Sequence, residues 1–78
     1  MDRHQIEVVV LTVLASVLKC EAGPDSSRHN TPKWDSLKHI EIVFAIEDEL
    51  GIEFSEEELT SLDSVDKIVN SALTRHAA

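Results

Sequence analysis

The clearest alternation of apolar and polar residues lies between residues 36 and 50. On a helix of 3.6 residues per turn, four aliphatic residues of this stretch share one broad face: Ile40, Val43, Ile46 and Leu50. Leu37 and Phe44 fall towards one edge of that face, while Glu41 and Asp48 lie beyond the edge, on the exposed side. The pattern therefore predicts an amphipathic helix with an acidic strip and apolar neighbours.

The start of this helix has a cap and a hydroxyl. Asp35 is a favourable N-cap, because its carboxylate can accept the free backbone N–H groups of the first turn. Ser36 then takes the first helical position, with its hydroxyl exposed at the helix N-terminus. A serine after an aspartate at a helix start is commonly only capping geometry, so these two residues alone do not decide a function.

Another helix is predicted earlier in the chain, over residues 3–19, so this is the first helix and residues 36–50 form the second. Seven apolar residues lie on one side of the first helix: Ile6, Val9, Val10, Val13, Leu14, Val17 and Leu18. Polar residues lie opposite, and Val8 is the one apolar residue out of place. The apolar run is shorter than the roughly 20 residues that a membrane span needs. Asp2 and Glu7 offset Arg3, so the start lacks the positive charge of a signal peptide.

The connections carry turn and cap residues. Gly23 and Pro24 are expected to end the first helix and begin a long irregular loop through Lys33. Gly51 ends the second helix. Ser55 and Glu58 form a capping box that opens a short helix over 56–61, burying Leu59 and Leu62. Asp63 or Ser64 caps a last helix over 65–75, whose apolar face is Val65, Ile68, Val69, Ala72 and Leu73.

Composition supports a helical fold. The 78 residues make one small domain with three aromatic residues, Trp34, Phe44 and Phe54, which argues against a sandwich or barrel. We therefore predict an all-α bundle of three longer helices and one short one, spanning residues 1–78.

Cys20 is the only cysteine, so no intramolecular disulfide can form. It is interpreted as a small apolar residue near a helix end, in a cytoplasmic protein.

The formal charge of −8 is unevenly distributed. Residues 1–34 hold four acidic and four basic residues, whereas residues 35–78 hold eleven acidic and three basic ones. This charge disfavours nucleic acid and favours basic protein partners. An acidic half also serves solubility, but solubility alone does not explain why the imbalance begins at Asp35.

The second helix resembles the acyl carrier protein family. The residues that carry the resemblance are Asp35-Ser36-Leu37, followed by Glu41, Ile42, Val43, Ala45, Glu47, Glu49, Leu50 and Ile52. The likeness covers residues 30–75, and more loosely the first helix. It implies a four-helix bundle with a long loop between helices 1 and 2. It also implies that Ser36 carries 4'-phosphopantetheine, joined by a phosphodiester and taken from coenzyme A.

The resemblance further implies a carrier that is not itself an enzyme. Acyl or aminoacyl chains would be held as thioesters for fatty-acid, polyketide or related specialised biosynthesis. The partners would be a phosphopantetheinyl transferase and basic-surfaced enzymes that transfer these chains, with no membrane and no nucleic acid, and the carrier would be a monomer. The expected partner-binding residues are Asp35, Leu37, Glu41, Phe44, Glu47 and Asp48.

Trp34 and His39 need separate interpretation. Trp34 is expected to cover the end of the bundle and fix the loop to the second helix; the alternative is an aromatic wall beside the prosthetic arm. A tryptophan before Asp35-Ser36-Leu37 resembles carriers of specialised pathways more than the housekeeping fatty-acid carrier. His39 is interpreted as a surface residue at the flank of the partner face.

Other functions fit the sequence less well. A calcium loop starting at Asp48 would need glycine at position six and glutamate at position twelve, where the chain has Glu53 and Leu59, so no metal site is predicted. Ser36 is not in a G-x-S-x-G motif, and no base for it is identified. The remaining alternative is an unmodified, acidic helical interaction domain in which Ser36 only caps the helix.

Overall fold

The computed structural model describes residues 2–77, and for residues 76 and 77 the backbone alone. It has an all-α fold, as predicted, with three longer helices and one short one. Their bounds are α1 Arg3–Leu18, α2 Ser36–Leu50, α3 Glu56–Leu59 and α4 Val65–Ala77. Within the described residues, no helix is long and apolar enough to cross a membrane.

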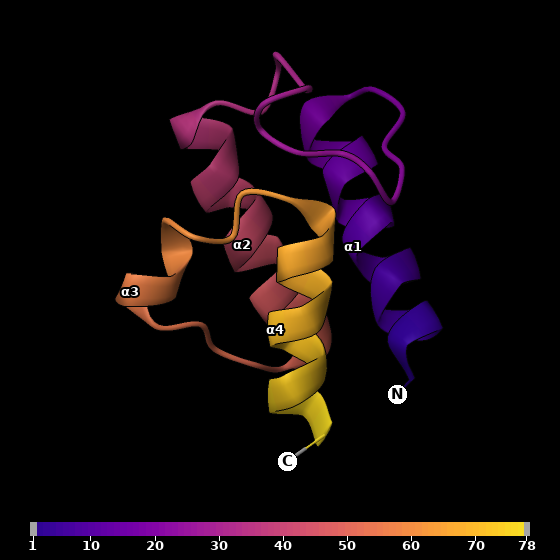
Figure 1. The fold of residues 1–78 in the computed structure, drawn as a ribbon, viewed down its shortest axis with the longest axis vertical. Coiled ribbons are helices and arrows are strands. Elements are labelled where there is room, and N and C mark those ends of the chain that lie inside the picture. Colours follow the sequence, from indigo (N-terminus) through magenta and orange to yellow (C-terminus); the bar gives the residue numbers. More distant parts are fainter. Residues whose placement is uncertain (1, 78) are drawn as a thin grey trace.

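The helices form a bundle with α1 in contact with both α2 and α4. In Figure 1, α1 rises from the chain start, the long loop crosses the top, and α2 returns downwards. The helix α4 begins lower than α2 and also runs down, while the short α3 lies to one side. Both α2 and α4 therefore run from the side of the long loop towards the end that carries the chain termini.

The core is aliphatic. Its fully buried side chains include Ile6, Val10 and Leu14 from α1, Ile42 and Ile46 from α2, and Val65, Ile68 and Val69 from α4. Burying one such side chain contributes about 1.5–3 kcal/mol to folding, which makes these three helices the main source of stability. Val8 is half exposed, at 49 %, as the helical wheel predicted.

Three of the predicted helix signals are confirmed. Gly51 adopts the left-handed conformation, with φ of 67°, directly after α2. Ser55 and Glu58 make both bonds of the capping box at α3. Ser64 caps α4, since its hydroxyl accepts the N–H of Lys67 at 3.2 Å.

Two boundaries differ from the sequence prediction. The helix α1 ends at Leu18, because Lys19 turns into the left-handed region with φ of 54°, four residues before Gly23. Gly23 and Pro24 therefore do not end the helix. The helix α3 ends at Leu59 rather than at residue 61.

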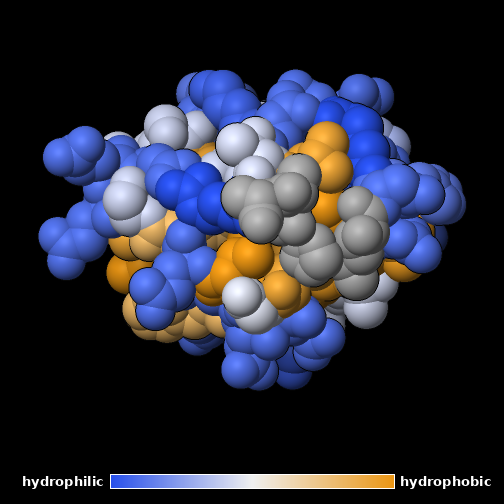
Figure 2. Space-filling model, turned by 90° about the horizontal axis from the view of Figure 1, so that it is seen from below, coloured by the Kyte–Doolittle hydropathy of each residue, from blue (hydrophilic) through white to orange (hydrophobic). Residues whose placement is uncertain are grey.

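The end of the bundle that carries both chain termini is largely polar. Figure 2 views the molecule from this end and shows hydrophilic side chains around smaller hydrophobic patches. The candidate site described below lies at the opposite end, where the long loop crosses the start of α2.

Candidate functional site

The start of α2 presents a serine hydroxyl at the first helical position. Asp35 is the N-cap, with φ of −94° and ψ of −177°, and its carboxylate accepts the N–H of Lys38 at 2.9 Å. Its carbonyl accepts the N–H of His39 at 2.8 Å. This geometry fixes the first turn and leaves Ser36 exposed.

The long loop between α1 and α2 is tied to the start of α4. Ser27 and Ser64 form an isolated antiparallel bridge. Beside it, the N–H of Arg28 donates to the carbonyl of Asp63 at 2.9 Å, and the N–H of Val65 donates to the carbonyl of Ser26 at 3.0 Å. These two bonds fix the backbone of the loop next to the candidate site.

The anchored loop brings a cation to the serine. Nη2 of Arg28 donates a hydrogen bond to Oγ of Ser36 at 3.2 Å. The sequence analysis did not single out Arg28, because eight residues separate it from Ser36 and only the folded loop brings them together. No signal in the sequence alone would have identified this contact.

His39 is buried, so the interpretation of it as a surface residue is wrong. Its side chain is 5 % exposed and lies between Trp34 and the end of α3. The indole N–H of Trp34 donates to Nδ1 of His39 at 3.1 Å, and Nε2 of His39 lies 2.6 Å from the carbonyl oxygen of Leu59. Because Nδ1 accepts, the ring proton is on Nε2, which donates to Leu59.

Trp34 takes the packing role. Its side chain is 2 % exposed, and its ring stacks near that of His39 at an interplanar angle of 27°. The ring thus joins the last residue of the loop to α2 and, through His39, to α3. With so little exposed surface, Trp34 offers almost no face to a prosthetic arm.

The burial of His39 means that a different set of α2 residues faces solvent than the sequence predicted. Ile40 was assigned to the core face, but it is 48 % exposed, while His39 and Ile42 are buried instead. Ile40 therefore joins Leu37 and Phe44, which are 68 % and 61 % exposed, in an apolar strip along the outside of α2. We call these three residues the α2 apolar strip.

Acidic residues flank the α2 apolar strip. Glu41 and Asp48 are exposed, as expected, and Lys38 forms an ion pair with Glu41 at 3.5 Å. Glu47 is different, because it is half buried and its carboxylate accepts the N–H of Phe54 at 2.7 Å. That bond ties Glu47 to the segment after α2, which leaves it less available to a partner than Glu41 or Asp48.

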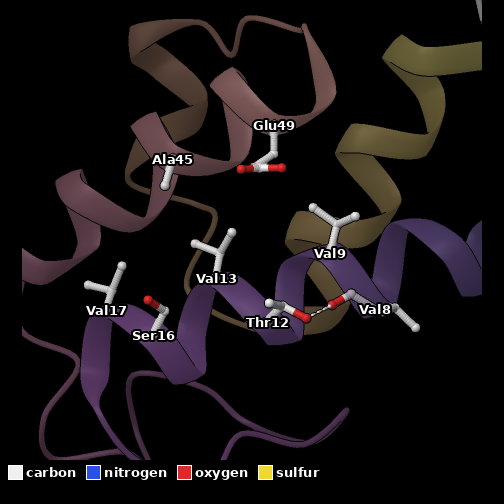
Figure 3. Close-up of a pocket in the computed structure, with 8 residues that line it drawn as sticks. All are labelled: Val8, Val9, Thr12, Val13, Ser16, Val17, Ala45 and Glu49. Atoms are coloured by element: carbon white, nitrogen blue, oxygen red, sulfur yellow. Dashed lines mark hydrogen bonds between the residues drawn. The ribbon is translucent and has the colours of Figure 1, made fainter.

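One groove of the bundle lies away from the serine, between α1 and α2. It measures about 320 Å³, and Figure 3 shows Val9, Val13 and Val17 of α1 pointing towards Ala45 and Glu49 of α2. The groove has an apolar floor and one overhanging carboxylate. Within the described residues, no cluster of three or more histidine, cysteine or acidic side chains is arranged to hold a metal.

The residues around Ser36 suit a phosphate ester on its oxygen. Arg28 donates to that oxygen and carries a permanent positive charge. Asp35 uses its side chain on Lys38, so in the described chain the N–H groups of Ser36 and Leu37 have no acceptor. Free N–H groups at a helix start favour an anion. An exposed hydroxyl with these donors therefore fits a phosphodiester attached at Oγ.

Comparison with known protein families agrees with this chemistry. The model of the family described as phosphopantetheine attachment site matches residues 8–71, which is most of the chain. Domains of this family carry covalently attached 4'-phosphopantetheine, act as carriers rather than catalysts, and interact with phosphopantetheinyl transferases and acyl-handling enzymes. Because the match covers most of α1, all of α2 and α3 and the first half of α4, this chain belongs to the phosphopantetheine attachment site family of acyl-carrier-type domains.

Proposed function

We propose that Ser36 is the attachment residue and that the chain is a carrier of acyl or aminoacyl intermediates. The observation that supports this most strongly is the exposed Ser36 hydroxyl at the first position of α2, beside Arg28. When bound, the arm supplies a thiol on which cargo is held as a thioester. The arm is long and flexible, so the carrier's own residues need only fix its base and present it.

The chain's residues divide this work. Asp35 fixes the first turn of α2 through the N–H of Lys38, so Ser36 keeps one orientation towards a transferase. Trp34 and His39 hold that turn to α3 from behind. None of these groups acts as a base towards Ser36, so the serine proton must pass to a base on the transferase.

We further propose that partners dock on the outside of α2. The residues expected to contact them are Asp35, Leu37, Glu41, Phe44, Glu47 and Asp48, with Ile40 added by its exposure. A mixed apolar and acidic surface suits brief, charge-steered contact with several basic enzymes in turn. Glu47 is the weakest member of this set, because its carboxylate already accepts the N–H of Phe54.

The proposal for the pathway rests on one residue. Because Trp34 comes directly before Asp35, we propose a specialised fatty-acid, polyketide or related pathway. We also propose that the carrier acts as a monomer in the cytoplasm. The mass of the loaded protein isolated from its own cells would identify the cargo. A simple long-chain fatty acyl group as the main cargo would argue against a specialised pathway.

The test of attachment uses intact mass. Co-expressed with a transferase of broad specificity, the wild type is expected to gain the mass of one phosphopantetheinyl group, and Ser36→Ala is expected to gain none. Ser64→Ala is the matched control, because it removes a serine hydroxyl at another helix start. Modification that persists in Ser36→Ala would overturn the assignment. A wild type that stays unmodified would favour the alternative, an acidic interaction domain in which Ser36 only caps α2.

A further inference from the structure

Arg28 is unusual among the arginines of this acidic protein. Arg3 pairs with Asp66 at 2.8 Å, and Arg75 pairs with Glu58. Across residues 2–77, by contrast, Arg28 has no carboxylate partner, and its side chain bonds to Oγ of Ser36. With eleven acidic residues from position 35 onward, an arginine directed at a neutral hydroxyl is not explained by charge pairing.

The position of Arg28 is set by the fold rather than by a flexible loop. Its backbone N–H donates to Asp63, and the neighbouring Ser27 lies in the bridge to Ser64. The side chain is half buried. A guanidinium held by a fixed backbone loses little freedom on binding an anion, which is the arrangement that favours a preorganised contact.

The nearby acid does not compete for Arg28. Asp63 lines a hollow of about 300 Å³ together with Arg28, His29, Trp34 and Thr60. Its carboxylate is bonded to Nζ of Lys67 at 3.0 Å, and this hydrogen bond holds the pKa of Asp63 below its ordinary value. The other carboxylate oxygen of Asp63 lies 3.9 Å from Nε2 of His29. Among the described residues no ion pair joins Asp63 to Arg28, so the remaining N–H donors of Arg28 stay available beside Ser36.

We propose that Arg28 is a positioning residue of the attachment site, which orients the Ser36 oxygen before transfer and then holds the phosphodiester formed on that oxygen. The inference rests on the proposed function of Ser36. In the transfer, a bond forms between Oγ and the phosphorus of coenzyme A that carries the pantetheine. The bond from that phosphorus to adenosine 3',5'-bisphosphate breaks, and the serine proton passes to a base of the transferase.

The chemistry of the guanidinium suits both stages. Arginine only donates, so its bond to Oγ leaves the serine proton free to depart. Four further N–H donors remain for phosphate oxygens, and the planar fork of arginine matches them better than a lysine ammonium. The same contact therefore serves the hydroxyl first and the anionic ester afterwards.

The first test measures the kinetics of modification by a purified transferase with coenzyme A, for wild type, Arg28→Gln and Arg28→Lys. We expect kcat/KM to fall about tenfold in Arg28→Gln, mainly through kcat, which is the size of one lost hydrogen bond from a charged donor. Arg28→Lys should recover part of the loss. Lys33→Gln is the control, since it removes an exposed loop cation five residues away and should leave kcat unchanged.

The direction of the change in kcat/KM shows whether Arg28 positions the serine or only adds a positive charge to the surface. If Arg28 acted only as a positive charge facing a basic transferase, its removal would lower KM and raise kcat/KM. That result would overturn the proposal, as would unchanged kinetics. Circular dichroism of each variant checks folding, and Arg28→Lys, which keeps the charge and bulk, carries the test if Arg28→Gln is misfolded.

The second test uses the modified protein and does not depend on transfer activity. The ³¹P resonance of the phosphodiester is expected to shift and to narrow in Arg28→Gln, because the group loses a fixed donor and moves more freely. Lys33→Gln should match the wild type. Identical ³¹P spectra for Arg28→Gln and wild type would overturn the inference while the carrier function stands. A phosphopantetheinyl group that remains on Ser36→Ala by intact mass would instead overturn the assignment of Ser36.

Discussion

The starts of α1 and α2 both have an aspartate N-cap, but they are stabilised differently. At α1, Asp2 accepts the N–H of Gln5 while the Gln5 side chain accepts the N–H of Asp2, which completes a capping box. At α2, Asp35 accepts the N–H of Lys38, but a lysine at this position cannot return the bond. The N–H of Asp35 donates instead to the carbonyl of Lys33 at 3.1 Å. The first start is therefore capped by a residue of its own helix, whereas the second depends on the loop before it, and we call the second the loop-held start.

The loop-held start of α2 has further contacts from outside the helix. His39 connects it to Trp34 and to Leu59, and Arg28 reaches it from the long loop. This support from behind and from one side stabilises the turn while the hydroxyl of Ser36 remains accessible. The comparison supports a structural cap at α1 and agrees with the attachment site that we propose at α2.

The largest effect is expected from His39→Leu, which would break the support behind α2. The substitution leaves the buried N–H of Trp34 and the carbonyl of Leu59 without their partner. We expect the free energy of unfolding to fall by about 2–4 kcal/mol, because each unsatisfied buried group costs about 1–3 kcal/mol.

The matched control for this variant is His4→Leu at the start of α1. His4 is exposed, so its replacement should change the free energy of unfolding by no more than about 0.5 kcal/mol. Urea denaturation followed by circular dichroism measures both variants. Equal midpoints would contradict the view that α2 depends on this buried contact.

The same contrast explains what the sequence could predict. The caps at Asp35 and Ser55 and the turn at Gly51 depend on residues a few positions apart, so the sequence predicted them correctly. The carrier fold and the phosphopantetheine cofactor followed from the family resemblance, which Asp35-Ser36-Leu37 carries together with the residues that follow it in α2. All of these signals are local in the chain.

The failures at His39 and Ile40 have a single physical cause. The helical wheel placed Ile40 inside because it is apolar and left His39 outside because it is polar. The acceptor for His39 is twenty residues away and its donor precedes the helix, so a buried polar residue could not be inferred from spacing. The Arg28 contact was missed for the same reason, since it depends on the bridge between Ser27 and Ser64.

A second pair of variants compares the two caps directly. Asp2→Ala and Asp35→Ala each remove the side-chain acceptor of a helix start, and each should lower the free energy of unfolding by about 1 kcal/mol. Only Asp35→Ala should also slow the modification of Ser36, because its cap fixes the turn that holds the hydroxyl. Thermal unfolding measures the stability of each variant, and intact mass measures the rate of modification. Equal slowing in both variants would contradict a special role of the Asp35 cap in the modification of Ser36.

A smaller effect is expected from charge on the outside of α2. Glu41→Lys should slow modification roughly two- to fivefold at low salt, the range of one exposed charge contact, and the loss should shrink as salt rises. Lys38→Glu should raise the rate of modification or leave it unchanged.

Phe44→Ala should also weaken docking, with little salt dependence, because it removes apolar contact. Initial rates of modification, measured against ionic strength, test all three variants. Equal salt slopes for Glu41→Lys and wild type would show that the transferase does not recognise the charge of Glu41.

The smallest effect is expected from ionic strength, which should change the melting temperature of the whole molecule. The −8 charge lies from Asp35 onward, so repulsion should be greatest around α2 and α3. Added salt or Mg²⁺ should therefore raise the melting temperature by a few degrees, through screening of exposed charges. Circular dichroism melts at low and high ionic strength test this, and a flat response would mean that the acids are too dispersed to repel measurably.

The central claim is that the arm is attached at Ser36, the first residue of α2, and fragment mapping of the modified protein tests it most directly. The modified protein is digested, and tandem mass spectrometry locates the phosphopantetheinyl group within the peptide that spans Trp34 to Lys38. Our account predicts that the added mass lies on Ser36 alone, with Ser55 and Ser64, the cap serines of α3 and α4, unmodified. Added mass on either of those serines, or a modified protein whose Ser36 peptide has its unmodified mass, would contradict it.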